Sequence, residues 1–109
     1  IDGDPYGQTG WAILYLHIET RDRVELGTRL QAGDRIGHPS CEGGISTGSH
    51  LHIARRYNGE WIPADQDLPF VLDGWVSQGQ GYVYQGFMVR GSQSIQAEET
   101  LTDFNRIQR

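Results

Sequence analysis

Glycine spacing constrains this chain more than any other feature of its sequence. Fifteen glycines and four prolines break the 109 residues into short segments, and both residue types interrupt regular helices. The segments between them are short and rich in β-branched and aromatic residues. We therefore expect β-structure nearly throughout, with a helix-like residue mix only in the last dozen residues.

The clearest strand pattern lies in residues 11–18, WAILYLHI. Alternation places Ile13, Tyr15 and His17 on one face of an extended segment, and the other face is also largely apolar. Two apolar faces are typical of a strand that is covered on both sides.

Further segments also favour β-structure. In residues 24–39 single apolar residues stand between glycines, which predicts very short strands joined by tight turns. The pair Asn58-Gly59 is a strong hairpin signal. The remaining strand-like runs are residues 50–57, 70–76 and 81–90.

Length, hydropathy and charge narrow the class of protein. A chain of 109 residues fits one domain, and its longest apolar run, Ala12–Leu16, is far too short to span a bilayer or to serve in a signal peptide. We therefore expect a soluble chain with no membrane span, so that any export signal would lie before Ile1.

The net charge is −5, with no basic cluster beyond Arg55-Arg56. That charge argues against a nucleic-acid partner.

Two histidines stand one residue apart behind a glycine-rich loop, in GISTGSHLHIARR. In an extended strand His50 and His52 point the same way, about 7 Å apart, so both can face one small cavity. One can bind a metal while the other reaches a metal-bound water. His17 lies on a separate strand and could approach the same cavity. The spacing alone fits ordinary strand histidines equally well.

Three blocks of sequence together resemble a known family. LYLHI, VELGTRLQAGDRIG and GGISTGSHLHIARRYNGEWIPAD are similar, in order and spacing, to the lysostaphin-like, LytM-type zinc metallopeptidases, which cut peptide cross-links in bacterial cell walls. The resemblance runs from about residue 11 to residue 65. It implies an all-β fold, a compact antiparallel β-structure of the duplicated-hybrid-motif type, with a groove for a peptidoglycan peptide or another glycine-rich peptide.

The resemblance also implies roles for individual residues. His17 falls on a catalytic histidine, His50 on the histidine that assists the zinc-bound water, and His52 on a zinc ligand. Tyr15 could line the substrate groove, although strand aromatics more often belong to a core. Gly44 and Gly48 could let a substrate backbone approach, or could simply form turns.

One departure from the family pattern concerns the zinc site. The family's other two ligands form an upstream His-x-x-x-Asp motif, which this sequence lacks. His38 and Glu42 have ligand-like spacing, but they precede the glycine loop, where the family has no ligand. We therefore expect the carboxy-terminal half of such a peptidase, with an incomplete zinc site and the upstream half as a separate or missing partner.

The resemblance also suggests a domain organisation and a location. Residues 1–66 would form the half domain, 67–97 would add trailing strands packed on it, and 98–109 would be a polar tail. The expected location is outside a bacterial cell or in its envelope.

Three other classes of protein share features with this sequence. Lipoyl and biotinyl carrier domains share the glycine rhythm, but they modify a lysine and this chain has none. A phosphocarrier with two histidines gives no reason for the STGSHLH block. The serious alternative is a non-catalytic, peptidase-like module that binds cell wall or another protein.

Cys41 is the single cysteine. By residue type, a lone cysteine is usually a small buried hydrophobe. In an exported protein an odd cysteine suggests a disulfide partner elsewhere, and here the upstream half is the expected place for it.

Overall fold

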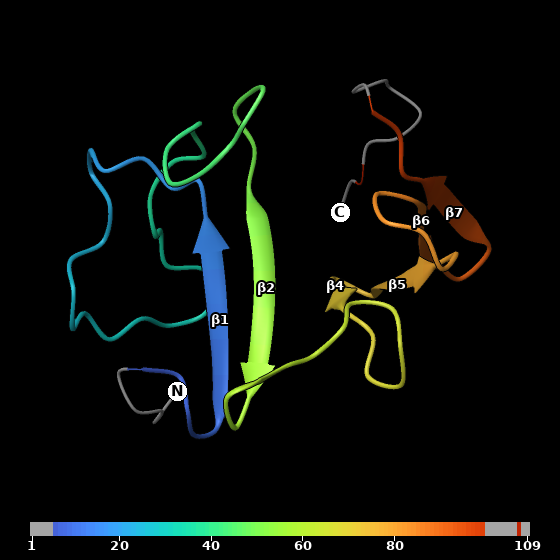
Figure 1. Cartoon of the computed structure of the whole chain (residues 1–109), viewed down its shortest axis with the longest axis horizontal. Coiled ribbons are helices and arrows are strands. Elements are labelled where there is room, and N and C mark those ends of the chain that lie inside the picture. Colours follow the sequence, from blue (N-terminus) through green and yellow to red (C-terminus); the bar gives the residue numbers. More distant parts are fainter. Residues whose placement is uncertain (1–5, 100–106, 108–109) are drawn as a thin grey trace. The chain divides into compact units, whose positions relative to one another are not determined.

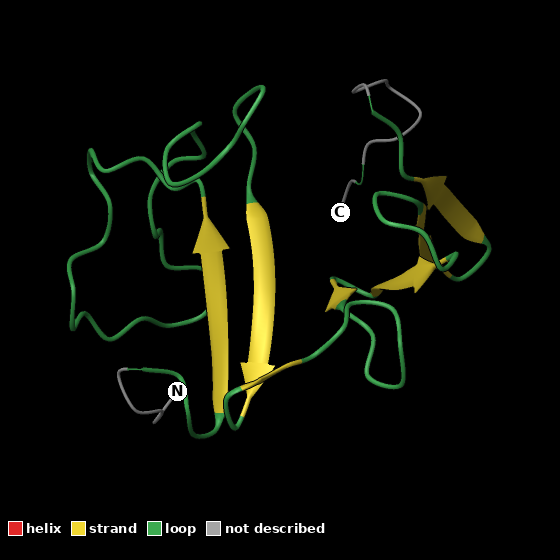
Figure 2. Ribbon diagram, viewed as in Figure 1, coloured by secondary structure: helices red, strands yellow, loops and turns green. Residues whose placement is uncertain are grey.

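Seven short strands make up the regular structure of the described part of the chain. The computed structural model describes residues 6–99 and 107, and within them it contains strands and loops but no helix (Figure 2). The strands form two antiparallel sheets, one in the order β1-β2-β3 and one in the order β4-β5-β6-β7. The predicted all-β class is therefore confirmed. The described residues fall into two compact units, one ending at Trp61 and one beginning at Ile62.

The first unit is built on one long strand pair. β1 (Trp11–Leu16) and β2 (His52–Tyr57) pair along their full lengths, with Trp11 opposite Tyr57 and Leu16 opposite His52 (Figure 1). β3 (Glu60–Trp61) returns along β2 after a turn. At that turn Asn58 has a φ of 48° and Gly59 a φ of 82°. Two left-handed residues are what a two-residue hairpin turn requires, so the predicted hairpin is confirmed.

Both faces of β1 are partly open. The side chains of Ile13 and Leu14, on opposite faces, are 44% and 41% exposed. The expectation of a strand covered on two sides is therefore wrong for this unit as described. The apolar pattern correctly predicted the strand, but it does not determine whether other residues bury the two faces of that strand.

A long loop connects β1 to β2. Between Leu16 and His52 the backbone forms no regular strand, and its β-pairing is limited to isolated bridges from Ile18 to Pro39 and from Ser40 to His50. The predicted very short strands in residues 24–39 are therefore wrong. The predicted tight turns are present, because Thr28 N–H donates to Glu25 O at 3.2 Å and Asp34 N–H donates to Gln31 O at 3.1 Å.

The missing strands of this loop have a simple cause. Each of its apolar residues stands alone between glycines and polar residues, so no run is long enough to form a ladder. Leu26, for example, is fully exposed.

The second unit is a meander in which each strand pairs with the next. Its sheet consists of β4 (Val71–Leu72), β5 (Trp75–Gly79), β6 (Gly86–Arg90) and β7 (Gln93–Gln96). Trp75 is its most buried apolar side chain, 2% exposed, and the Arg90 guanidinium lies 4.7 Å from its ring centroid.

The second unit corrects two strand predictions. Residues 70–76 are not one strand, because Asp73 and Gly74, with φ of 50° and 78°, form a turn between β4 and β5. Residues 81–85 form a loop instead of the start of a strand. β7 falls within residues 67–97, the predicted trailing strands, although no strand-like run marks its bounds.

The predicted boundaries at residues 66 and 97, and the packing of the trailing strands on the half domain, stay predictions. Most of the predicted polar tail, residues 98–109, lies outside the described residues. Among residues 6–99 and 107, no helix has the length and apolar character needed to cross a membrane.

Candidate active site

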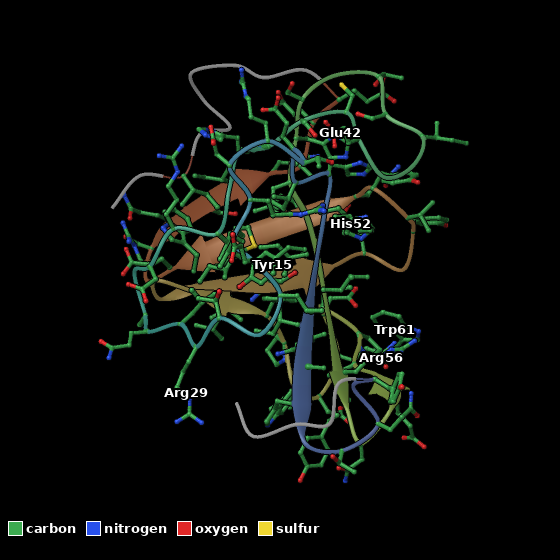
Figure 3. The ribbon with its side chains drawn as sticks, turned by 90° about the vertical axis from the view of Figure 1, so that its left-hand side faces the viewer. Tyr15, Arg29, Glu42, His52, Arg56 and Trp61 are labelled. Atoms are coloured by element: carbon green, nitrogen blue, oxygen red, sulfur yellow. The ribbon has the colours of Figure 1, made fainter. Side chains whose placement is uncertain are left out.

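Three histidines gather at one end of the β1-β2 pair. His17 directly follows β1, and His52 is the first residue of β2, where it pairs with Leu16. His50 lies two residues before His52 and bridges Ser40. Figure 3 labels His52 and Glu42 near this end of the strands. The fold thus brings together residues that are 35 positions apart in the sequence.

His17 ends β1 with an unusual backbone conformation. Its φ is 65°, a left-handed value that costs a residue with a side chain about 1 kcal/mol. Two contacts hold it there, because the His17 carbonyl oxygen accepts hydrogen bonds from the Ser40 N–H at 2.6 Å and the Ser40 hydroxyl at 3.0 Å. The left-handed turn breaks the strand alternation, so the position of the His17 ring does not follow from that of Tyr15.

The His17 side chain is buried and anchored. Its ring is 6% exposed, and its Nδ1 lies 2.8 Å from the main-chain oxygen of Glu42. A carbonyl oxygen only accepts, so Nδ1 carries the hydrogen. In the neutral ring, Nε2 is then the nitrogen with the free lone pair.

His50 is anchored in the same way but is exposed. Its Nδ1 lies 2.9 Å from the Gly48 carbonyl oxygen and 3.2 Å from the Ser46 hydroxyl oxygen. The Ser46 hydroxyl itself donates to the Gly48 oxygen at 2.6 Å. The His50 Nδ1 hydrogen therefore points into a small cradle of acceptors, and Nε2 again keeps its lone pair.

The two imidazoles lie directly against each other. The ring centroids of His17 and His50 are 4.3 Å apart, with the ring planes inclined at 44°. In both rings Nδ1–H donates to a main-chain carbonyl oxygen. The lone pair on Nε2 is therefore the one that can accept a proton or bind a metal. Such anchoring fixes the tautomer and orientation of a reactive histidine.

His52 and Tyr15 lie on opposite faces of the strand pair. His52 shares a face with its partner Leu16, and the register puts Tyr15, opposite Ile53, on the other face. The His52 side chain is exposed. Tyr15 is 41% exposed and lines a pocket of about 440 Å³ together with His17 and Glu42. The predicted roles of His17, His50, His52 and Tyr15 stay predictions.

The two predicted substrate glycines have different surroundings. Gly44 has a φ of 146°, and a Cβ built on it would lie 3.4 Å from Cε1 of His17. A glycine at this position therefore lets the backbone pass close to the imidazole. At Gly48 a Cβ would meet open space, and the carbonyl of this residue holds His50. Their contact with a substrate stays a prediction.

Glu42 supports the loop that anchors His17. Its carboxylate accepts hydrogen bonds from the Thr20 hydroxyl at 2.6 Å and the Thr20 N–H at 2.8 Å. These bonds, the hydroxyl first, hold the pKa of Glu42 below its ordinary value, and the charge of Arg23 adds to the effect.

Glu42 and His38 have different partners in the structure. Arg35 contacts the His38 ring, with Nη2 3.1 Å from Nδ1, whereas the Glu42 carboxylate bonds to Thr20. Across residues 6–99 and 107, histidine, cysteine, aspartate and glutamate side chains form no group of three that could hold a metal ion.

Sequence reasoning missed the residues that position the histidines. Ser40 fixes the His17 backbone, Ser46 shapes the cradle of His50, and Thr20 holds Glu42. Ser46 lies in the STGSH block and could have been singled out as a hydroxyl beside a histidine. The Glu42 contact to His17 uses a main-chain oxygen, for which no residue type is a signal.

Cys41 is exposed in the structure. The expectation of a small buried hydrophobe is therefore wrong for this residue. A disulfide to a segment outside the described residues stays a prediction.

Comparison with known proteins finds a partial similarity to a protease. The chain is 36% identical over 61 residues to Protease LasA of Pseudomonas aeruginosa, in strain PAO1 and equally in strain UCBPP-PA14. The match covers 50% of this chain and 14% of the length of that protease. No family model matches the chain, and no solved structure gives a significant match.

Proposed function

We propose that this chain supplies catalytic residues to a zinc-dependent endopeptidase that hydrolyses peptide cross-links of peptidoglycan or another glycine-rich peptide. The observation that carries the proposal is the His17–His50 pair, with ring centroids 4.3 Å apart and each Nδ1 anchored on a main-chain carbonyl. The similarity to a protease over half of the chain supports the same reaction class. Such an enzyme would act outside the bacterial cell or in its envelope.

The two histidines have complementary roles in this proposal. His50 is exposed, and the lone pair on its Nε2 can take a proton from the attacking water. His17 donates its Nδ1 hydrogen to Glu42 O, so it can stabilise a developing oxyanion through Nε2–H only when the ring is protonated. The proposal therefore gives His50 the proton-accepting role and His17 the hydrogen-bond-donating role.

The described residues alone do not fit a complete zinc site. Catalytic zinc takes three protein ligands, and no such group exists among residues 6–99 and 107. We therefore propose His52 as one ligand and a His-x-x-x-Asp segment, in the same protein or a partner chain, as the source of the other two. When bound, zinc polarises the scissile carbonyl and lowers the pKa of its water.

The first experiment measures zinc binding to residues 1–109 alone. We expect weak binding in calorimetry and no hydrolysis of cross-linked peptidoglycan, because a single ligand cannot hold the metal. Tight stoichiometric zinc would contradict the assignment of ligands.

The second experiment restores the His-x-x-x-Asp segment and compares variants. His52→Ala should lose zinc. His50→Gln and His17→Asn should keep zinc and lose about 10²-fold or more in turnover, because a base or an oxyanion donor is removed while the ligand remains. His38→Ala, a histidine bound by Arg35, is the control and should keep both zinc and turnover.

Two results would reject the proposal. If zinc content falls equally in the His52, His50 and His17 variants, the separation of ligand from catalytic residues is wrong. If the restored protein binds peptidoglycan without cleaving it, the chain is a non-catalytic, peptidase-like binding module.

A further inference from the structure

The second unit contains a pocket that the proposed peptidase does not use. It has a volume of about 480 Å³, and all of its lining residues belong to this unit. This volume falls within the range of small-molecule sites in proteins. The pocket combines aromatic rings, side-chain amides and two acidic residues. Three features of its lining determine which kind of ligand it can bind.

The first feature is a glycine floor. Gly79 and Gly86 stand opposite each other on β5 and β6, and both line the pocket. A Cβ on Gly86 would come within 2.5 Å of the Gln78 carbonyl oxygen, and a Cβ on Gly79 would collide with the Asp65 carboxylate. The absence of side chains on this floor brings the Asp65 carboxylate against the strand backbone.

The second feature is a row of side chains across three strands. Gln78 on β5, Phe87 on β6 and Gln96 on β7 are direct partners in the register, so they share one face of the sheet. Phe87 is half-buried and the two glutamines are exposed. An apolar ring thus lies between two amides, each of which can donate and accept hydrogen bonds.

The third feature is the loop between β5 and β6. Tyr82 and Tyr84, both in the pocket lining, are 74% and 95% exposed. Exposed aromatic side chains that stand together are typical of a binding surface. Tyr84 has a φ of 62°, a left-handed conformation that few residues with side chains adopt.

Charge decides which ligand fits. Among residues 6–99 and 107, the lining includes Asp65 and Glu98 but no lysine, arginine or histidine, so the described part of the lining has no group to pair with a phosphate or a carboxylate. Its hydrogen-bonding groups suit hydroxyls, and its rings suit a flat apolar surface. A neutral sugar ring has both, with an apolar C–H face and hydroxyls around its edge.

We propose that this pocket binds a neutral oligosaccharide, which stacks on the tyrosine rings and hydrogen-bonds to the glutamine amides and the Asp65 carboxylate. The inference does not depend on the peptidase proposal, because it uses residues of the second unit only.

The test is calorimetric titration of residues 1–109 with chitohexaose and cellohexaose, with pentaglycine as a peptide probe. We expect an oligosaccharide to bind and pentaglycine not to bind. Binding of a neutral ligand should be unchanged between about 0.05 and 0.5 M salt, because no charge pairs are formed. Amide resonances of Gly79 and Gly86 should shift on titration, which locates the site independently of any variant.

Variants test the role of the rings. Tyr84→Asn removes the ring but keeps a residue that tolerates the left-handed backbone, and it should weaken binding about tenfold. Tyr84→Phe keeps the ring and should bind as the unaltered chain does. Tyr6→Ala removes a tyrosine of the first unit that is 80% exposed, and it should leave binding unchanged.

Three outcomes would overturn the inference. The first is that neither oligosaccharide binds at millimolar concentration, and the second is that one binds without sensitivity to Tyr84→Asn. The third is that pentaglycine shifts the Gly79 and Gly86 resonances, which would assign a peptide to this pocket.

Discussion

The two units differ in what they bury. Among residues 6–99 and 107, the most buried side chain of the first unit is that of His17, 6% exposed, and that of the second is Trp75, 2% exposed. His17 is held by a hydrogen bond to a main-chain oxygen, whereas Trp75 packs beneath the Arg90 guanidinium. The first unit is thus organised around a hydrogen-bonded imidazole and the second around a buried indole.

The units also differ in how their strands are connected. β1 and β2 are separated by residues 17–51, whereas each strand of the second sheet pairs with its neighbour in sequence. Closing a long loop costs more chain entropy than forming a tight turn. The first unit gains little apolar burial in return, since both faces of β1 remain partly open. We infer that the second unit is the more self-sufficient of the two.

The largest expected effect on stability is that of Trp75→Ala. Removing a buried indole should cost about 3–5 kcal/mol of unfolding free energy, measured by urea unfolding with amide signals of β5 and β6. Trp61→Ala, at a side chain that is 52% exposed, is the matched control and should cost less than about 1 kcal/mol. Equal costs would remove the contrast between a buried and a surface indole.

A smaller effect is expected at the imidazole pair. His17→Asn keeps a residue that tolerates the left-handed backbone but loses the hydrogen bond to Glu42 O, which should cost about 1–2 kcal/mol. His50→Asn, at an exposed position, should cost less than about 0.5 kcal/mol. Native-state hydrogen exchange of β1 and β2 amides measures both. A greater loss at His50 would mean that burial of His17 does not organise the unit.

A third prediction concerns pH and the Glu42 carboxylate. Its pKa is held below the ordinary value mainly by the Thr20 hydroxyl, so Thr20→Val should raise that pKa toward the ordinary value. A lowered pKa in the folded state stabilises the protein above the unfolded-state pKa, and this contribution disappears as the pH falls through the folded-state value. NMR titration of Glu42 is the measurement, with Thr28→Val as the control. An unchanged pKa in Thr20→Val would contradict the assigned cause.

The smallest effect on stability is expected from modification of Cys41. Since the residue is exposed, its thiol should react with a thiol reagent without denaturant, and alkylation should change stability by less than about 0.5 kcal/mol. Intact mass with and without reductant, measured on the natural protein, tests the predicted disulfide. A thiol that reacts only after unfolding would show that Cys41 is protected.

The sequence predicted what periodicity and turn chemistry determine. β1, β2 and the Asn58-Gly59 hairpin follow from alternation and from a turn dipeptide. Asp73-Gly74 is also a turn dipeptide. It interrupts residues 70–76, which the apolar pattern alone predicts as one strand.

The geometry of the candidate site could not be predicted in the same way. The contact between the imidazole rings depends on the left-handed φ of His17 and on the bridge from Ser40 to His50. Its anchors are main-chain carbonyls of Glu42 and Gly48. Every residue has such a carbonyl, so its use as an anchor leaves no trace in residue type.

The position of β1 in its sheet has a practical consequence. In the order β1-β2-β3 it is an edge strand, and within residues 6–99 and 107 no strand pairs with its outer side. An edge of six mostly apolar residues, WAILYL, is a template on which another copy can add a strand. Residues 1–109 on their own should therefore self-associate as concentration rises, and a segment that pairs with this edge would act as a solubility factor as well as a structural partner.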